Sequence, residues 1–189
     1  MIRRRSLLRR LLLPLALLAG SSMPRAGTAL RLGLRELLER SDLCLEGRVI
    51  AVRAVLQDHP RRIDTEYTIQ VARTFWGEPR AVRVVRIPGG VLPDGRGMTV
   101  PGLPRLGMAE EAILFLSGAD ANGMRMPVGL AQGRLRVETD RIGRRILVRD
   151  EGELAVVGEP HAIGGPVVLD YAATVTEIEA AVARRRSKR

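Results

Sequence analysis

The side chains that could act as nucleophiles or bases are few. Cys44 is the only cysteine of the chain, and His59 and His161 are the only histidines. A Cys–His pair needs an exposed thiol in an electropositive setting, with a base within reach. Cys44 instead lies in an apolar run, whereas both histidines lie in loops beside prolines. The pattern predicts a buried, inert thiol and no nucleophilic pair.

The sequence also has few residues that could support a serine nucleophile or a metal site. After the first 29 residues the only serines are Ser41, Ser117 and Ser187, and none stands in a Gly-x-Ser-x-Gly nucleophile elbow. A zinc site requires three or four His, Cys or carboxylate ligands at short spacing, which two isolated histidines do not supply. We therefore expect no catalytic residue, no metal site and no cofactor.

Two other motifs give weak chemical signals. Glu110 and Glu111 are adjacent carboxylates, but neighbouring residues of an extended chain point to opposite sides. A turn before a strand is therefore favoured over a paired acid–base site. The glycines around Arg96 lack the strand–loop–helix setting and the Lys-Ser/Thr ending of a phosphate-binding loop. Both motifs indicate turns.

A long loop rich in glycine and proline is the strongest candidate for a binding site. It spans residues 88–104, and loops of this length without regular structure tend to be functional or mobile. We expect it to lie near residues 129–133 and to contact another protein, because apolar side chains on a flexible loop form an adaptable surface. The candidate contact residues are Arg96, Met98, Val100, Leu103 and Gln132. The alternative is that the loop only crosses the sheet and covers an edge strand.

A long first strand is expected to position these loops. It covers residues 41–55, and its better-buried side holds Leu45, Gly47, Val49 and Ala51. On its second side we expect Glu46 and Arg48 in solvent but Ile50 and Val52 buried. A strand of this kind leaves one sheet layer and enters another, and Gly47, which lacks a Cβ, is the expected bend. A buried helix is the alternative, which the Val and Ile content disfavours.

The remaining pattern predicts a mainly β fold. Leu30, Leu34, Leu37 and Leu38 share one face of a helix that precedes the first strand. Further strands are expected at residues 65–73, 82–87, 112–116, 124–128, 134–138 and 145–149, with residues 154–157 as a further candidate. The first of them, with Tyr67, Ile69 and Val71 inward, is expected to form an antiparallel hairpin with the long first strand. A capping box at residues 174–177 predicts a final helix with Val175, Ile178, Ala181 and Val182 on its apolar face. The fold class is an antiparallel barrel, closed or partly open, of five to seven short strands with a helix at each end.

The N-terminus has the features of an export signal. A basic stretch over residues 1–10 precedes an apolar stretch over 11–19 that is too short to span a bilayer unaided. Small residues offer cleavage sites at 27–29 or at 20–22. We expect Sec export to the periplasm or the medium. A twin-arginine signal and an uncleaved membrane anchor are the alternatives.

The net charge of +10 belongs to the two ends of the chain. Eleven of the 31 basic residues lie in residues 1–29 and 184–189, so residues 30–183 hold 20 basic against 21 acidic residues, a net charge of −1. A nearly neutral body argues against a nucleic-acid surface. The basic tail is either a solvated helix end or a contact with an anionic surface, and we expect membrane contact only through the leader or this tail.

Several motifs in order resemble a known group of proteins. They are residues 41–49 after a helix, Trp76-Gly77 after a Thr-rich strand, residues 85–90, residues 98–102, residues 110–116 and residues 129–133. This order is similar to that of small exported bacterial proteins of no assigned function, over most of residues 30–140. It also resembles, more distantly, the OB-type barrel of the netrin module and the tissue inhibitors of metalloproteinases. Those inhibitors bind the protease zinc through an N-terminal cysteine, whereas Cys44 lies inside a strand. The resemblance thus implies an OB-like fold without that mechanism.

These observations favour an exported, non-enzymatic binding or interaction module whose partner is another exported protein. The expected organisation is a signal peptide over residues 1–29, a β-barrel domain with an N-terminal helix over 30–160, and a linker, C-terminal helix and basic tail over 161–189. An envelope-anchored structural protein and a hydrolase that uses the 88–104 loop as a lid are the alternatives.

Overall fold

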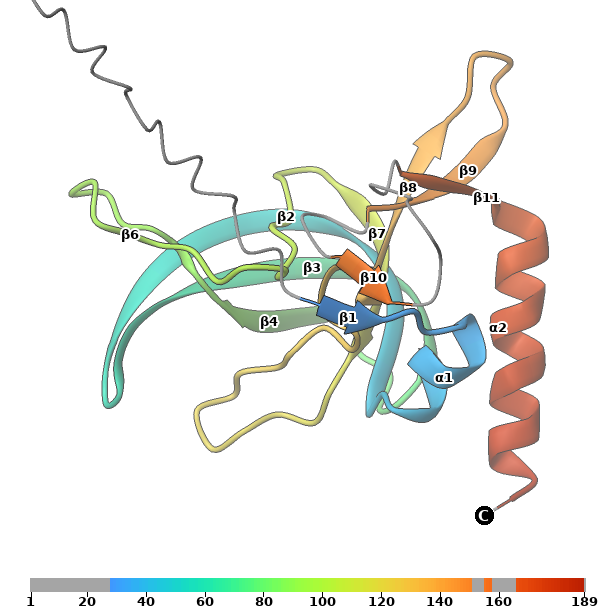
Figure 1. The fold of residues 1–189 in the computed structure, drawn as a ribbon, viewed down its shortest axis with the longest axis horizontal. Helices are drawn as coiled ribbons and strands as arrows, with labels where there is room; N and C mark the ends of the chain where they lie inside the picture. The colour runs from blue at the N-terminus through green and yellow to red at the C-terminus, as the bar shows by residue number, and fades with distance from the viewer. Residues whose placement is uncertain (1–27, 151–154, 158–165, 189) are drawn as a thin grey trace, which may run out of the picture.

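The computed structural model describes residues 28–150, 155–157 and 166–188, and its main feature is an antiparallel sheet of seven strands (Figure 1). In sheet order these are β11 (Val167–Asp170), β9 (Arg145–Arg149), β8 (Arg134–Thr139), β7 (Glu111–Leu116), β2 (Leu43–Asp58), β3 (Arg61–Trp76) and β4 (Val82–Pro88). The prediction of a mainly β, antiparallel fold is confirmed.

Two small sheets and three helical segments complete the described fold. Strand β1 (Thr28–Leu30) pairs in parallel with β10 (Ala155–Val157), and β5 (Gly90–Val91) pairs with β6 (Gly97–Met98). The helices are α1 (Leu34–Glu39), the 3-10 turn η1 (Leu130–Gly133) and α2 (Tyr171–Arg186). No helix among the described residues is both long and apolar enough to cross a membrane.

Strands β2 and β3 form a long curved ribbon, as the predicted hairpin requires (Figure 1). Each has 16 residues, and their register shifts at three places, one of them between Glu46 and Gly47. A Cβ on Gly47 would lie only 2.6 Å from the carbonyl oxygen of Gln70 and 2.6 Å from Cγ2 of Ile69. Only glycine allows this close approach of the two strands, and the register shift beside it lies at the position where the bend of the first strand was expected.

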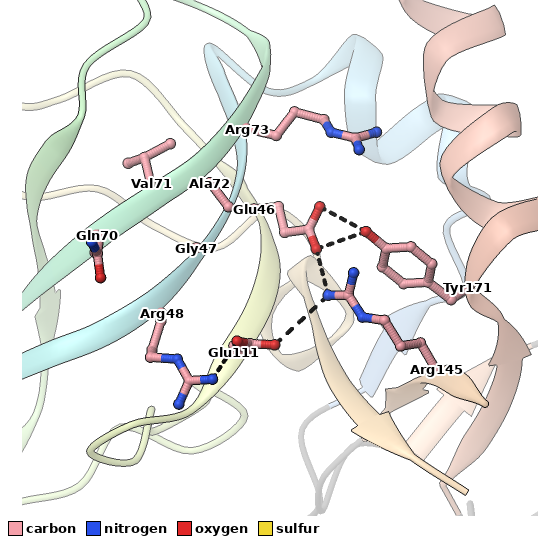
Figure 2. A pocket seen from close by; sticks show the side chains of 10 residues that line it. All are labelled: Glu46, Gly47, Arg48, Gln70, Val71, Ala72, Arg73, Glu111, Arg145 and Tyr171. Carbon is pink, nitrogen blue, oxygen red and sulfur yellow. Dashed lines mark hydrogen bonds and ion pairs between the residues drawn. The ribbon is translucent and has the colours of Figure 1, made fainter. Parts of the chain in front are cut away.

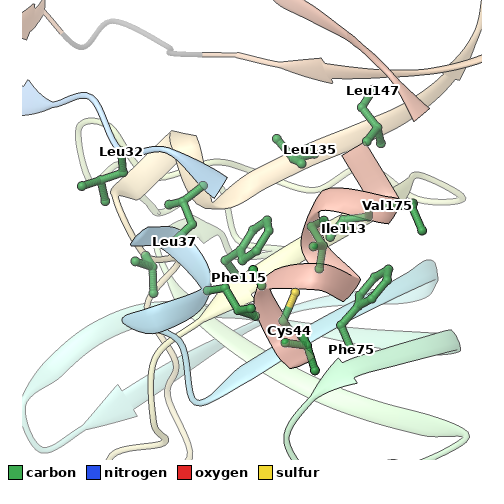
Figure 3. Close-up of a cluster of buried hydrophobic side chains, with 14 residues drawn as sticks. Leu32, Leu37, Cys44, Phe75, Ile113, Phe115, Leu135, Leu147 and Val175 are labelled. Carbon is green, nitrogen blue, oxygen red and sulfur yellow. The ribbon is translucent and has the colours of Figure 1, made fainter. Parts of the chain in front are cut away.

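The sheet carries one hydrophobic core on each face. The first core lies between the sheet and the two helices and contains Cys44, Ile113, Phe115 and the α2 residue Ile178 (Figure 3). The second core contains Leu45, Leu114 and Tyr67, and the chain around Leu103 and Leu106 packs against it. Every residue of β7 after Glu111 is buried because both of its faces are covered, as its apolar run predicts.

The burial expected along β2 is wrong at four positions. Ala51, expected on the better-buried side, is exposed, because the register shift between Val49 and Ala51 moves it to the opposite side of the strand. Ile50 and Val52 are 46% and 39% exposed, whereas Glu46 is only 5% exposed. The pairing of β2 with β7 ends at Arg48. The β2 residues after Arg48 therefore have no β7 strand beside them, which leaves Ile50 and Val52 exposed. Glu46 lies before that point and is covered by distant parts of the chain.

Helix α1 begins later than predicted, and helix α2 begins earlier. Leu30 belongs to β1, and α1 starts only at Leu34 after Gly33. Helix α2 starts at Tyr171, because the Asp170 side chain accepts a hydrogen bond from the Ala173 amide at 2.8 Å. The expected capping box at residues 174–177 is therefore wrong. The predicted apolar face of α2 is confirmed, since Val175, Ile178, Ala181 and Val182 are all buried.

The strand predicted over residues 124–128 is reduced to two isolated bridges. Met124 bridges Arg86 of β4 in parallel, and Pro127 bridges Leu116 of β7. Residues 161–165 lie outside the described residues, whereas 167–170 form β11 beside β9 instead of the expected linker. The seven-stranded sheet thus has β4 and β11 at its ends.

Candidate functional site

One face of the ribbon formed by β2, β3 and β4 is open to solvent, and we call it the outer face. The strand register places its residues in three rows. The rows are Arg48, Gln70 and Val82; then Ala51, Thr68 and Val84; then Arg53, Glu66 and Arg86. Ile50 has no register partner on β3, because it is the extra residue of the shift before Ala51, and it is exposed there. The opposite face of the same strands carries Tyr67, Ile69 and Val85 of the second core.

The middle of the outer face is aliphatic. Ile50 is 46% exposed, Val82 49% and Val84 57%, and they surround Thr68 on its two flanking strands. Outward positions of an antiparallel sheet with one solvated face are usually polar. Strand propensity accounts for a single exposed valine, but three aliphatic side chains grouped on neighbouring strands form a patch.

A groove of about 340 Å³ lies at the end of the outer face next to α2 (Figure 2). Its walls come from β2, β3, β7, β9 and the first residue of α2. The lining residues are Glu46, Gly47, Arg48, Gln70, Val71, Ala72, Arg73, Glu111, Arg145 and Tyr171. The groove and the outer face share Arg48 and Gln70, so they form one continuous surface.

Glu46 is the buried carboxylate of the groove. The Tyr171 hydroxyl donates a hydrogen bond to it at 2.8 Å, and the Arg145 guanidinium donates another at 2.9 Å (Figure 2). The same guanidinium lies over the Tyr171 ring, with its Cζ 4.0 Å from the ring centroid. Three elements far apart in the sequence are thereby joined, and the buried charge of Glu46 is compensated.

The electrostatics of this cluster act on the tyrosine. Burial, followed by the hydrogen bond to Glu46 and the charge of Glu46, raises the pKa of the Tyr171 hydroxyl. Tyr171 therefore remains a neutral donor at physiological pH.

Two further ion pairs border the groove. Arg48 donates to Glu111 from the neighbouring strand, and Arg145 lies 3.7 Å from the same carboxylate. Arg73 donates to Glu179 of α2 at 3.0 Å. All three arginines are exposed, and a guanidinium has five N–H donors. The groove can thus offer donors to a carboxylate or phosphate group while its own carboxylates stay paired.

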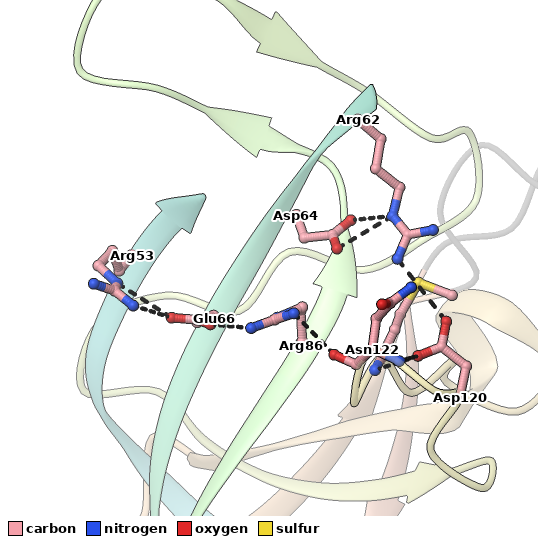
Figure 4. A network of polar contacts seen from close by, with 8 residues as sticks. Arg53, Arg62, Asp64, Glu66, Arg86, Asp120 and Asn122 are labelled. Carbon is pink, nitrogen blue, oxygen red and sulfur yellow. Dashed lines mark hydrogen bonds and ion pairs between the residues drawn. The ribbon is translucent and has the colours of Figure 1, made fainter. Parts of the chain in front are cut away.

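The far end of the outer face is a second ionic row (Figure 4). Arg53 donates to Glu66 at 2.7 Å, Arg86 donates to the other oxygen of the same carboxylate, and Arg86 also donates to the Asn122 carbonyl at 2.8 Å. The hydrogen bond from Arg53, and then that from Arg86, lowers the pKa of Glu66. This row fixes β2, β3, β4 and the turn after β7 to one another.

The loop residues predicted to contact a partner occupy different environments. Arg96 is exposed and pairs with Asp94 at 2.7 Å, while Met98 belongs to β6 and is half-buried. Val100 is half-buried, and Leu103 packs against the second core. The start of the loop is held against β3, since the Gly89 amide donates to the Ile63 carbonyl at 2.8 Å.

Gln132 is fully buried and cannot contribute to an exposed contact surface. Its Oε1 accepts a hydrogen bond from the Leu32 amide at 2.9 Å, which ties η1 to the chain before α1. The structure therefore does not bring Gln132 and the four loop residues onto one accessible surface.

The side chains that could act as nucleophile and base also lie apart. Cys44 is buried in the first core, and this burial raises the pKa of its thiol far above the usual range. His59 is exposed at the β2–β3 turn, at the far end of β2 from Cys44, and His161 lies outside the described residues. Among the described residues, no group of three His, Cys, Asp or Glu side chains could hold a metal ion.

The two adjacent glutamates point to different partners, as expected for an extended chain. Glu110 lies 3.3 Å from Arg134, whereas Glu111 pairs with Arg48. Sequence reasoning missed the groove because Tyr171 and Arg145 lie 125 and 99 residues from Glu46. Val82 and Val84 alternate with Arg83 in the sequence, and this alternation was the available signal for an aliphatic row on one side of β4.

Comparison with known proteins adds no family assignment, since no family model and no curated protein matches the chain.

Proposed function

We propose that this protein is an exported, non-enzymatic binding module that holds another exported protein on its outer face. The observation that carries the proposal is the exposed aliphatic group of Ile50, Val82 and Val84. Grouped apolar side chains on a solvated surface mark interaction sites in soluble proteins. Export is supported by the basic and apolar stretches of residues 1–19, which lie outside the described residues.

The charged rows at both ends support the same function. Protein–protein contacts usually have an apolar centre and a polar rim. Here the rim residues Arg48 and Arg53 are already paired with Glu111 and Glu66. Side chains held in this way lose less conformational freedom on binding, so the surface is organised before a partner arrives.

We also propose an OB-like barrel as the framework of this surface. Its support is the ring formed by β2, β3, β4, the bridging residues 124–127 and β7, which returns to β2. Four strands and one short bridging segment correspond to a five-stranded, partly open barrel. In OB-type barrels, the face that binds oligonucleotides or oligosaccharides is formed by strands, and the outer face of this protein is likewise formed by strands.

The proposed function is tested by a substitution in the centre of the outer face. Val84→Lys puts a charge in the patch without touching the core, because the Val84 side chain points to solvent. Ile142→Lys is the matched control, since Ile142 is 73% exposed in the β8–β9 turn, away from the outer face. Each variant is immobilised and incubated with the exported proteins of the source organism, and thermal melting verifies its fold.

A protein that is recovered with the wild type and with Ile142→Lys but not with Val84→Lys supports the proposal. Equal recovery with all three proteins contradicts it. A third protein that lacks residues 91–104 tests the loop: loss of the partner only with this deletion would place the contact on the loop instead.

A further inference from the structure

Strand β4 is an end strand of the seven-stranded sheet, and its backbone has a defined open side. The Ala81 carbonyl accepts from the Val71 amide, and the Gly89 amide donates to the Ile63 carbonyl, so odd-numbered residues direct their peptide groups toward β3. The Arg86 carbonyl instead accepts from the Arg125 amide on the other side. Because peptide groups alternate along an antiparallel strand, Val82 and Val84 direct their N–H and C=O groups away from β3.

Within the part of the chain that the structure describes, this edge is covered only at the end that holds Arg86. Residues 124–125 bridge β4 at Arg86. Among the described residues, no hydrogen bond reaches the outward peptide groups of Val82 or Val84. Unpaired edge groups of this kind are a template for another strand, and their side chains are the exposed valines of the outer face.

The charge beside this edge is positive. The Arg83 guanidinium donates to the Glu78 carbonyl at 2.6 Å, and the Arg125 guanidinium donates to the Ser117 carbonyl at 2.7 Å. Both of these acceptors are backbone groups, and among the described residues no ion pair joins either arginine to a carboxylate. Burial, followed by the charges of Arg125 and Arg80, lowers the pKa of Arg83, which agrees with mutual repulsion in this group.

We propose that β4 accepts an extended, acidic segment of the partner protein as an added strand at residues 82–84. On such a strand, aliphatic side chains on one side pack against Val82 and Val84, and carboxylates on the other side meet Arg83 and Arg125. Main-chain hydrogen bonds then supply the pairing, and the alternation of aliphatic and acidic residues supplies the specificity. This inference rests on the proposed binding function and adds the binding geometry and the partner's chemistry.

A second copy of the chain fits this edge poorly. If two β4 strands paired antiparallel about a two-fold axis through this edge, Arg83 of one chain would lie beside the basic edge of the other. Like charges on opposing strand positions destabilise a sheet. The positive edge therefore selects a segment of opposite charge.

The test uses a synthetic nine-residue peptide that alternates valine and glutamate, with a valine–lysine peptide of the same length as the charge control. Binding to the full chain is measured by fluorescence anisotropy. Val84→Pro removes an outward-facing N–H and replaces the isopropyl group by another apolar group, while the hydrogen bonds to β3 are kept, a change that edge strands tolerate. Val84→Thr is its matched control, because it keeps the N–H. Arg83→Gln tests the charge, and thermal melting verifies that each variant folds.

The acidic peptide should bind the wild type and Val84→Thr, while Val84→Pro should abolish binding. Arg83→Gln should weaken it about threefold, the size of one cross-strand charge pair. The basic peptide should not bind. Equal binding of the acidic peptide to Val84→Pro and wild type, or no binding to either, overturns strand addition. If partner recovery is lost with Val84→Lys but unchanged with Val84→Pro, the binding function stands and strand addition is wrong.

Discussion

The Arg185 guanidinium lies over the indole ring of Trp76, with its Cζ 4.1 Å from the ring centroid. The same guanidinium donates to the Leu38 carbonyl and, at 2.7 Å, to the Ser41 carbonyl at the end of α1. One side chain thus joins α2, the end of β3 and the C-terminus of α1. A cation is favourable beside the carbonyls at a helix C-terminus, and this one adds a charged donor to the Leu38 carbonyl, which also accepts from the Ser41 amide at 3.1 Å.

We predict that Arg185→Ala lowers the free energy of unfolding by about 2 kcal/mol, because it removes a cation–π contact and two charge-assisted hydrogen bonds. Arg185→Lys should lose part of this stability, since an ammonium keeps the charge but not the planar stacking. Urea unfolding followed by circular dichroism measures both. Arg184→Ala is the control, because Arg184 is exposed on the same turn of α2. Equal losses for Arg184→Ala and Arg185→Ala would contradict this role.

This contact also shows the limit of sequence reasoning for the basic tail. A run of cations at the end of a chain predicts either solvated side chains or an anionic partner. Arg185 is instead used within the fold, since its partners lie 144 and 147 residues away. No local pattern contains that information.

The β2–β3 hairpin could be predicted because its signal is local. The alternation around Tyr67 and Ile69 fixes which side of β3 is buried, and both residues are buried as expected. The exposure of Ile50 and Val52 could not be predicted in this way. It depends on where β7 ends beside β2, and that is a property of the strand pairing.

The groove was unpredictable for the same reason. The strand pattern predicts that Glu46 is exposed to solvent, because Arg48, the next residue on the same side of the strand, is also charged. Its burial follows from the position of Tyr171 and Arg145, which arrive from α2 and β9. The docking of α2 therefore creates the groove, and contacts along α2, including Arg73 with Glu179, support it.

Gly47 gives a steric test of the strand irregularity. Gly47→Ala should lower the free energy of unfolding by about 2 kcal/mol, because the new methyl group would overlap the Gln70 carbonyl and the Ile69 side chain. Gly97→Ala is the matched control. A Cβ there would lie 3.4 Å from its nearest neighbour, at ordinary contact distance. Chemical unfolding of both variants provides the comparison, and a change of less than 0.5 kcal/mol in Gly47→Ala, on the scale of a neutral surface substitution, would contradict the close approach.

Cys44 gives a chemical test of the first core. Because its thiol is buried and its pKa is raised, we expect no reaction with a thiol reagent in the native protein. Labelling should follow the fraction of unfolded chain as urea is added. Cys44→Ser should cost about 2 kcal/mol, because a hydroxyl is then buried in an apolar cluster. Rapid labelling in the absence of urea would show that the core opens around β2.

The contact between Tyr171 and Glu46 gives a test that depends on pH. Tyr171→Phe keeps the ring under Arg145 but removes the hydroxyl that donates to Glu46, so it should lower stability by about 1 kcal/mol at neutral pH. The folded state raises the pKa of Tyr171 above the unfolded value of 10.0. The stability contributed by its neutral hydroxyl is therefore fully present below pH 10.0 and is lost as the pH rises through the folded pKa.

The difference in stability between the wild type and Tyr171→Phe should consequently shrink above pH 10.0. Urea unfolding of both proteins across the alkaline range measures it, and the other tyrosine, Tyr67, affects both proteins equally. A difference that stays constant at all pH values would mean that the hydroxyl does not interact with a buried charge. A difference near zero at neutral pH would mean that Arg145 alone compensates Glu46, and that the end of the groove is held by the guanidinium and not by α2.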